Sequence, residues 1–396
     1  MDRRYENILR QHFRDDIQMA FVVGPRQVGK TTTCTSFETE HFYLNWDNED
    51  HQRLILGGPA TVAAEAGLST GKTIIFDELH KYVHWRNFIK GFFDTYGREL
   101  YRIVVTGSAR LDVYRKGGDS LLGRYFIYRM HPISVGEIGD VAFREREIAL
   151  PRKISDEDFE ALKRFGGFPD PFLRRNARFH NRWKRMRQQL LLREDVRDTT
   201  RIYEIAQVEL LAEFLRQQAG QRLNIAALAT RIRASQDSIR RWVGALESLY
   251  HCFLIRPWTR NISRSLLKDP KVYLWDWSAV DDVGARNENM VASHLLKAVH
   301  GWQDSGLGEY ELYFLRTRDK REVDFLVTRN NQPWFLVEVK SSGNQPLNKN
   351  LAYFQQHTGA EHAFQVVVEA DFVEADCFAM RHPVKVAART FLSQLL

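Results

Sequence analysis

The chain has 396 residues, of which 44% are hydrophobic and 12% aromatic, and 57 Lys and Arg against 50 Asp and Glu give a formal net charge of +7. This composition excludes a disordered chain, and the length favours two to three domains. The basic excess favours an anionic partner such as nucleic acid. No apolar run approaches the roughly 18 residues of a membrane span, and the charged N-terminus is not a signal peptide. Three scattered cysteines suit a reducing compartment, so we expect a cytoplasmic protein.

An amphipathic helix over residues 1–17 is expected to lead into a strand at residues 19–23, which ends at Gly24. Gly24, Gly29, Lys30 and Thr31 then form the pattern G-x-x-x-x-G-K-[ST], which is typical of a phosphate-binding loop when it follows a strand. The glycines let backbone N–H groups face phosphate oxygens, Lys30 brings charge to the β- and γ-phosphates, and the Thr31 hydroxyl can ligate Mg²⁺. The alternative is a glycine-rich turn with a chance lysine. The predicted ATP-binding residues are Gly24, Pro25, Arg26, Gln27, Val28, Gly29, Lys30, Thr31 and Thr32.

Two later apolar runs end in polar residues that suit ATP hydrolysis. The run TIIF is followed by Asp77 and Glu78, at the strand end where ligands bind in open α/β sheets. Asp77 is placed to hold Mg²⁺ through water, and Glu78 to orient and deprotonate the attacking water. The run RIVVT ends in Thr106, with Ser108 two residues later, and a polar residue there can touch the γ-phosphate or the water.

Five expected strands, at residues 19–23, 41–44, 73–76, 102–106 and 125–130, alternate with helical stretches. This alternation predicts a parallel sheet with right-handed crossovers.

At this point the sequence resembles the AAA+ ATPases, and more narrowly a large prokaryotic family that joins such an ATPase to a C-terminal domain of unknown function. The segments that carry the resemblance are GPRQVGKT, FYLNWD, IIFDELHK, VVTGSAR, LLGR, HPIS, FGGFPD, EVDFLV and FLVEVKSS, so it covers nearly the whole chain. It implies an AAA+ core, a helical and winged-helix middle, a nuclease-like C-terminal domain and a hexameric ring. It also implies an arginine that stabilises charge on the transferred phosphoryl group, often from a neighbouring subunit. Arg124 or Arg110 would serve, unless they are ordinary surface arginines.

The middle of the chain is helical and basic from about Pro151. The stretch RRNARFHNRWKRMR, residues 174–187, has seven Lys or Arg and no acid, with Phe179 and Trp183 on one helical face. It is either a phosphate-contacting helix or a helix that packs two aromatics and solvates its charges.

Residues 222–256 have the pattern of a helix-turn-helix followed by a strand, with Arg240 and Arg241 on the second helix. The functional interpretation is a winged helix that contacts DNA. The alternative is a packing module that touches no DNA.

The C-terminal segment has a strand at 271–276, a helix at 287–299 and three strands at 311–316, 322–328 and 334–339. Asp324 followed by Glu338-x-Lys340 resembles the PD-(D/E)XK nuclease site, although Val323 stands where the motif usually has proline. The two carboxylates could share a divalent metal with Glu288, and Lys340 could position the water that the metal activates. A retained fold with a lost site is the alternative.

We therefore predict an α/β protein, an AAA+ P-loop ATPase with a parallel sheet, a helical/winged-helix middle and a C-terminal PD-(D/E)XK-like α/β domain. The expected domains are residues 1–145, 146–205, 206–268 and 269–396. The predicted function is an ATP-hydrolysing motor that acts on DNA as a homo-oligomer, with ATP and Mg²⁺ bound and a possible metal-dependent nuclease domain. The alternatives are a nucleotide-switched binding, regulatory or protein-remodelling ATPase with an inactive nuclease-like domain, and a nuclease that the ATPase gates.

Overall fold

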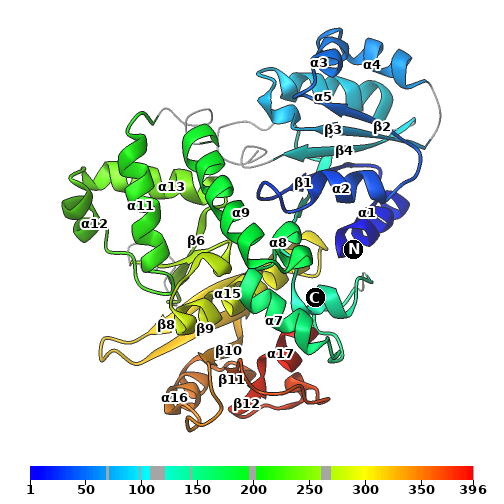
Figure 1. The fold of residues 1–396 in the computed structure, drawn as a ribbon. Helices are drawn as coiled ribbons and strands as arrows, with labels where there is room; N and C mark the ends of the chain where they lie inside the picture. Colours follow the sequence, from blue (N-terminus) through cyan, green and yellow to red (C-terminus); the bar gives the residue numbers. More distant parts are fainter. Residues whose placement is uncertain are drawn as a thin grey trace. The chain divides into compact units, whose positions relative to one another are not determined.

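The computed structural model describes residues 1–67, 71–97, 100–107, 121–142, 145–195, 202–259 and 269–395, with side chains described as far as Leu192 in the fifth range. It divides into two compact units, residues 1–131 with 141–144, and residues 132–140 with 145–396 (Figure 1). None of the helices described in these ranges is long and apolar enough to cross a membrane. The four expected domain ranges stay a prediction.

The first unit is built on a parallel five-stranded sheet with the strand order β2-β3-β4-β1-β5. The five strands predicted from the alternation of apolar runs and helices are confirmed. Their bounds are β1 Met19–Val23, β2 His41–Asn45, β3 Lys72–Asp77, β4 Tyr101–Gly107 and β5 Tyr125–Arg129. Every residue of β1 is buried, as expected for a central strand with both faces covered.

The helices of the first unit connect these strands. Their bounds are α1 Arg4–Asp15, α2 Lys30–Ser36, α3 Glu49–Leu56, α4 Pro59–Ala66, η1 Leu79–Lys81, α5 Trp85–Phe92 and η2 Phe93–Gly97. The side chains of α5 that pack on the sheet are aromatic or aliphatic, with Phe88 and Phe92 both against Phe76 of β3. This packing fixes β3, and with it the two acidic residues at its end.

The second unit begins with helices. Their bounds are α6 Val135–Gly139, α7 Asp156–Phe165, α8 Pro169–Arg174, α9 Ala177–Gln189, η3 Leu190–Asp195, α11 Ile205–Gln217, α12 Ile225–Ile232 and α13 Gln236–Ser248. The predicted turn between α12 and α13 is present. Arg233 ends α12 in the left-handed conformation, and the Ser235 hydroxyl caps α13 by accepting from the Ser238 N–H at 3.0 Å.

The second unit also contains a mixed seven-stranded sheet with the order β12-β11-β10-β9-β8-β6-β7. The strands are β6 Cys252–Pro257, β7 Lys271–Leu274, β8 Tyr310–Arg316, β9 Glu322–Arg329, β10 Gln332–Lys340, β11 His362–Val367 and β12 Val384–Ala387. The remaining helices are η4 Trp277–Ala279, α15 Val283–Asp304, α16 Lys349–Thr358, η5 Cys377–Ala379 and α17 Ala388–Gln394.

Strand β6, which was expected to be the wing of a separate module, belongs to this sheet. It pairs antiparallel with β7 and parallel with β8, so the boundary expected between residues 268 and 269 falls inside one sheet. The local pattern predicts that β6 is a strand but does not say which strands it pairs with. The sheet brings β9 and β10 together with the long helix α15, and these three elements carry the acidic residues of the predicted nuclease-like site.

Candidate functional site

The phosphate-binding loop between β1 and α2 has a backbone that suits glycine at two positions. Gly24 has a φ of 157°, and a Cβ there would lie 2.4 Å from the carbonyl oxygen of Met130. Gly29 has a φ of 98° at the N-cap of α2, and Gln27 also has a positive φ, of 64°. The loop therefore has the tight curl that its motif predicts.

A residue that the sequence did not single out braces this loop. The buried guanidinium of Arg3 donates hydrogen bonds to the carbonyl oxygens of Val28 and His131, each at 2.7 Å. Of the predicted ATP-binding residues, Gly24, Pro25, Val28 and Lys30 are buried, Arg26, Gln27 and Gly29 are half-buried, and Thr31 and Thr32 are exposed. The bracing by Arg3 holds the middle of the loop against the irregular segment that follows β5.

The ammonium of Lys30 lies at the loop and beside the acidic end of β3. Its Nζ donates to the carbonyl oxygens of Gly24 and Pro25, each at 2.9 Å, and the side chain is 6% exposed. Burial lowers the pKa of Lys30, and the nearby carboxylates of Glu78 and Asp77 oppose that shift. Lys30 is thus held where a positive charge can meet phosphate oxygens.

Asp77, at the end of β3, is surrounded by hydroxyl groups. One carboxylate oxygen accepts from Thr31 Oγ1 at 2.8 Å and from the Tyr43 hydroxyl at 2.7 Å, and the other accepts from Thr106 Oγ1. The strand order explains this grouping, because β2 and β4 flank β3 and contribute Tyr43 and Thr106. Three of the predicted residues, Thr31, Asp77 and Thr106, therefore meet in one place.

Tyr43 was missed as a site residue. Burial and the hydrogen bond to Asp77 raise the pKa of its phenol, so it stays a hydrogen-bond donor at neutral pH. The segment FYLNWD, which carries part of the family resemblance, contains Tyr43, and this is the signal that could have found it.

Glu78 takes an unusual backbone conformation directly after β3. Its φ is 55°, a left-handed value that costs a non-glycine residue energy and is often found at functional sites. Its Oε2 lies 3.5 Å from Lys81 Nζ and 3.8 Å from His80 Nε2, and among the described residues this buried oxygen accepts no hydrogen bond. Lys81 Nζ is also 2.6 Å from Asp47, so it is shared between two carboxylates.

The donor set at Asp77 suits Mg²⁺, which prefers oxygen ligands and usually keeps several waters. Thr31 and Asp77 would hold the ion, which would supply positive charge to the phosphates of ATP. Lys30 and the curled loop would hold the phosphates of ATP.

Of the two candidate arginines, the structure describes Arg124 only. Arg124, just before β5, forms a two-pronged ion pair with Asp94, with Nε and Nη2 at 2.8 and 3.0 Å from the carboxylate oxygens. To reach a phosphoryl group it would have to exchange this partner. Arg110 and Ser108 lie outside the described residues.

The predicted nuclease-like residues are brought into one neighbourhood of the second unit. Asp324 on β9 accepts from the backbone N–H of Val339 on β10 at 2.9 Å. Glu338 accepts from Lys340 Nζ and from Asn348 Nδ2, each at 2.7 Å. Burial, and next the charge of Asp324, raise the pKa of Glu338. The residues predicted from adjacent strands therefore interact electrostatically.

A buried lysine that the sequence did not single out lies among these carboxylates. Lys271 Nζ on β7 is 2.8 Å from Glu322 Oε1, 3.3 Å from Glu288 Oε1 and 3.5 Å from Asp324 Oδ1, and its side chain is 4% exposed. The hydroxyl of Tyr273, two residues along the same strand, donates to Glu288 at 2.7 Å. Among the described residues, no three acidic, His or Cys side chains are grouped as a metal site.

The charges of this cluster shift one another's pKa. Burial first, and then the charge of Asp324, raise the pKa of Glu288 to about 7, although Lys271 opposes the shift. Burial alone would lower the pKa of Lys271, but Glu288, Asp324 and Glu322 outweigh it and raise the pKa. Lys271 is therefore charged at neutral pH.

The basic side chains of α13 and α9 differ in their surroundings. On α13, Trp242 is buried, while the side chains of Arg240 and Arg241 are 58% and 59% exposed. On α9, Trp183 is buried and Phe179 is half-buried under the Arg174 guanidinium, 4.2 Å from the ring centroid. Helix α9 therefore packs aromatic groups, and several of its arginines still face solvent.

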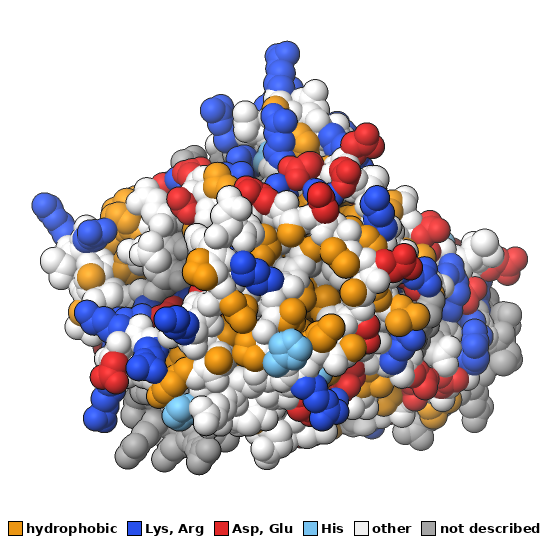
Figure 2. All heavy atoms as spheres, turned by 90° about the horizontal axis from the view of Figure 1, so that it is seen from below, with side chains coloured by type: hydrophobic (Ala, Val, Ile, Leu, Met, Phe, Trp, Pro, Cys, Tyr) orange, Lys and Arg blue, Asp and Glu red, His pale blue; other side chains and the backbone are white. Residues whose placement is uncertain are grey.

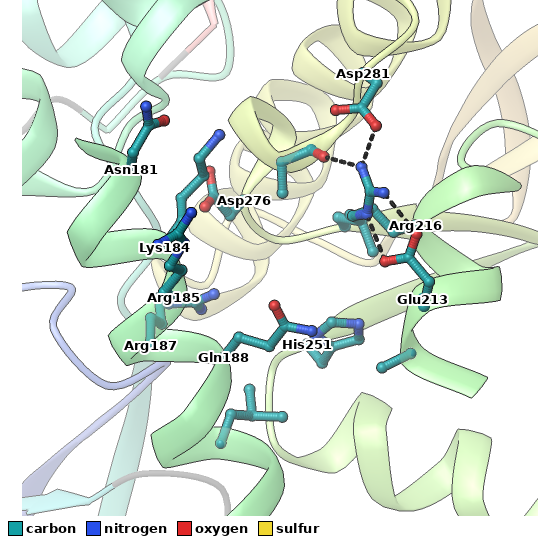
Figure 3. A pocket seen from close by; sticks show the side chains of 14 residues that line it. Asn181, Lys184, Arg185, Arg187, Gln188, Glu213, Arg216, His251, Asp276 and Asp281 are labelled. Atoms are coloured by element: carbon teal, nitrogen blue, oxygen red, sulfur yellow. Dashed lines mark hydrogen bonds and ion pairs between the residues drawn. The ribbon is translucent and has the colours of Figure 1, made fainter. Parts of the chain in front are cut away.

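Part of α9 lines a cavity of about 460 Å³ within the second unit (Figure 3). One wall carries Asn181, Lys184, Arg185, Arg187 and Gln188 of α9, and the other carries Arg216, held by Glu213 and Asp281. The α9 wall is therefore basic, and the opposite wall holds charged groups of both signs. On the face drawn in Figure 2, the described Lys and Arg side chains lie scattered among acidic and hydrophobic ones.

Comparison with known proteins assigns the first unit. Residues 16–139 match the family model of an AAA domain. The match indicates ATP binding and ATPase activity. Residues 156–283 match a domain of unknown function (DUF8612), and residues 283–379 match a second domain of unknown function (DUF4143). The fold agrees with an α/β protein that has a parallel sheet in its first unit and a mixed sheet in its second.

Two mycobacterial proteins are similar to this chain in sequence. The uncharacterized proteins Rv2008c of Mycobacterium tuberculosis and Mb2031c of Mycobacterium bovis are each 22% identical over 341 residues, 84% of this chain and 72% of theirs.

Similar solved structures include the three proteins that follow. The Walker-type ATPase paby2304 of Pyrococcus abyssi has a TM-score of 0.41 and 13% identity, over 72% of this chain and 95% of that one. RuvB of Thermotoga maritima has a TM-score of 0.32 and 16% identity, over 66% and 91%. Orc1 of Aeropyrum pernix, in complex with DNA, has a TM-score of 0.32 and 14% identity, over 73% and 90%. We draw no functional conclusion from likenesses at these TM-scores.

Proposed function

We propose that this protein is an ATP-hydrolysing AAA+ motor that acts on DNA and works as a homo-oligomer, in a hexameric ring. The observation that carries the ATPase part is the meeting of Thr31, Asp77 and Thr106 beside the buried Lys30. A strand-end carboxylate next to a P-loop lysine and hydroxyl is the arrangement that ATP hydrolysis with Mg²⁺ requires.

Each residue has a separate task in this proposal. Lys30 pairs with the β- and γ-phosphates, and Thr31 with Asp77 holds Mg²⁺. Glu78 orients the attacking water and accepts its proton. Thr106, near the end of β4, and Ser108, two residues later in the sequence, sense the γ-phosphate. Arg124 or Arg110 stabilises the charge that develops on the phosphoryl group. The ion pair with Asp94 holds Arg124 in place, and this supports a role for Arg124 at the ATP site of a neighbouring subunit.

The DNA part rests on α13. Its exposed arginines, Arg240 and Arg241, follow the turn of a helix-turn-helix, and the buried Trp242 fixes the helix so that they face outward. Exposed arginines on the second helix of such a motif suit contact with DNA phosphates or bases. The solvent-facing arginines of α9 would add contacts that do not depend on sequence.

A second candidate function is a nucleotide-switched binding, regulatory or protein-remodelling ATPase whose PD-(D/E)XK-like domain is inactive. The observation that favours an inactive domain is the buried Lys271 among its carboxylates. In either case the ATPase would drive movement between subunits.

One experiment distinguishes the two candidates. ATP turnover is measured with branched duplex, linear duplex and single-stranded DNA, and DNA affinity is measured over a series of salt concentrations. We expect at least one DNA form to raise turnover several-fold. We also expect the Arg240→Ala/Arg241→Ala protein to lose about 2 units of the slope of log K against log salt, because two phosphate contacts are removed.

The matched control is Arg53→Ala/Arg86→Ala, which removes two exposed arginines from the first unit and should keep the slope. If the protein neither binds any of the DNA forms nor changes its turnover with them, the protein-remodelling function is the better account.

A further inference from the structure

The carboxylates of the nuclease-like site already have a cation among them. Lys271 Nζ lies within 3.5 Å of oxygens of Glu288, Glu322 and Asp324, which come from α15 and β9. In a metal-dependent nuclease, these oxygens would have to turn toward a divalent ion instead. The group at the centre of the site is therefore an ammonium that is surrounded by carboxylates.

Each carboxylate of the cluster is also engaged by a donor of the protein other than Lys271. Arg316 binds Glu322, Tyr273 donates to Glu288, and the Val339 N–H donates to Asp324. Glu338, which would be the second metal ligand of the motif, accepts from Lys340 and from Asn348, each at 2.7 Å. Each carboxylate has its own protein donor.

Charge balance leads to the same conclusion. Four carboxylates, Glu288, Glu322, Asp324 and Glu338, contact three cations, Lys271, Lys340 and Arg316. A divalent ion bound to Glu288 Oε1 and Asp324 Oδ1 would compete with the Lys271 ammonium for these oxygens. Because Lys271 is buried, its charge is poorly screened and repels such an ion.

We infer that Lys271 takes the place of the divalent metal in this centre, so that the domain keeps a nuclease-like arrangement without metal-dependent hydrolysis. The ammonium joins β7, β9 and α15 by ion pairs. A shared metal ion would otherwise hold these elements together. This inference does not depend on the ATPase, because the cluster lies in the other unit.

The test measures Mn²⁺ binding directly. All proteins are full length and carry Asp77→Asn, so that Mn²⁺ at the ATPase site does not contribute. Free and bound Mn²⁺ are measured by electron paramagnetic resonance without nucleotide, and thermal unfolding is followed in EDTA and in Mn²⁺. With Lys271 intact we expect no saturable binding in the second unit and the same unfolding temperature in both solutions.

Replacing the ammonium with a neutral group of similar length should create the missing site. Lys271→Met should lower the unfolding temperature in EDTA, bind about one Mn²⁺ per chain and regain about 5 °C when Mn²⁺ is present. Lys340→Met is the matched control. It removes the other lysine of the cluster but keeps Lys271, so it should gain no Mn²⁺.

Three outcomes would overturn the inference. The first is saturable Mn²⁺ binding by the protein with Lys271 intact that disappears in Asp324→Asn. The second is Mg²⁺-dependent DNA cleavage that disappears in Asp324→Ala and Lys340→Ala. The third is a folded Lys271→Met protein that binds no Mn²⁺. If Lys271→Met does not fold, the comparison between the Lys271-intact protein and Asp324→Asn decides alone.

Discussion

Two acidic centres of this molecule have opposite surroundings. Asp77 in the first unit accepts hydrogen bonds from the hydroxyls of Thr31, Tyr43 and Thr106. Glu288 and Asp324 in the second unit face the ammonium of Lys271. A hydroxyl keeps a carboxylate negative and can itself ligate a metal, whereas an ammonium neutralises the carboxylate and repels a metal.

The difference shows that the acidic residues of the two centres are not equivalent. The charge of the neighbouring donors decides what a carboxylate can bind. In the first unit the cation that belongs to the site, Lys30, is held by the carbonyl oxygens of Gly24 and Pro25 and leaves Asp77 to the hydroxyls. In the second unit the lysine contacts the carboxylates directly.

The largest effect is expected from Lys30→Ala. It removes the charge that meets the phosphates, and we expect ATP turnover to fall by about 1000-fold or more, since such contacts supply most of the transition-state stabilisation in phosphoryl transfer. Steady-state turnover and nucleotide binding measure this. Lys385→Ala, an exposed lysine of the second unit, is the control and should keep its activity. Near-normal turnover in folded Lys30→Ala protein would rule out this centre.

A smaller effect is expected from Glu78→Gln, which keeps the shape of the side chain and removes the base. Turnover should fall about 100-fold while ATP with Mg²⁺ still binds. Asp77→Asn should instead weaken the Mg²⁺-dependent part of ATP binding, because it changes the oxygen that Thr31 and Tyr43 contact. Equal loss of binding in both variants would show that the roles given to Asp77 and Glu78 are wrong.

The sequence predicted those parts of the two centres that lie close together in the chain. Lys30 and Thr31 belong to one short motif, and Asp77 with Glu78 ends an apolar run, so local patterns were sufficient. Tyr43 and Lys271 reach their centres only through strand order, because β2 lies beside β3 and β7 is joined to the same sheet as β9. Nothing in their local sequence indicates a partner that lies dozens of residues away.

The same limit explains β6. Its apolar pattern predicted a strand and the preceding helices suggested a wing, but its pairing with β8 depends on residues more than fifty positions later. The buried faces of helices and strands were predicted from the periodicity of apolar residues, and the turns from capping residues. The contacts between distant segments, which fix the chemistry of each centre, required the structure.

A mixing experiment tests whether the first centre is completed by a neighbouring subunit. Arg124→Ala and Lys30→Ala proteins, each inactive, are mixed in equal amounts under conditions in which subunits exchange. If Arg124 acts across an interface, about a quarter of the sites combine an intact loop with an intact arginine, so turnover should recover to about a quarter of the normal rate. Asp94→Ala, which frees Arg124 from its ion pair, should remain active. No recovery after proven exchange would place Arg124 within one subunit.

The smallest effect concerns the stability of the second unit in acid. His294 on α15 is buried, where Nε2 accepts from the Val135 N–H at 3.1 Å and Nδ1 donates to the Met290 carbonyl at 2.7 Å. Burial lowers its pKa to about 4, with Lys297 adding to the shift and the Met290 carbonyl opposing it. The folded state therefore keeps the ring neutral, while the unfolded chain takes up a proton below about pH 6.5.

Because the folded pKa lies below the unfolded one, the stability that His294 contributes is present above pH 6.5 and is lost as the pH falls toward 4. Between pH 7 and 5.5 this amounts to about 1 kcal/mol, or a few degrees in the unfolding temperature. In His294→Gln, the amide oxygen can accept from the Val135 N–H and does not titrate. This protein should be less stable than the original at pH 7, but its free energy of unfolding should fall less on acidification. Buried His251 in the same unit, whose pKa is also lowered to about 4 by burial, is unchanged in both proteins and cancels in the difference. Parallel stability curves for the two proteins from pH 7 to 5.5 would show that His294 titrates normally in the folded state, and so is not held neutral by its two backbone contacts.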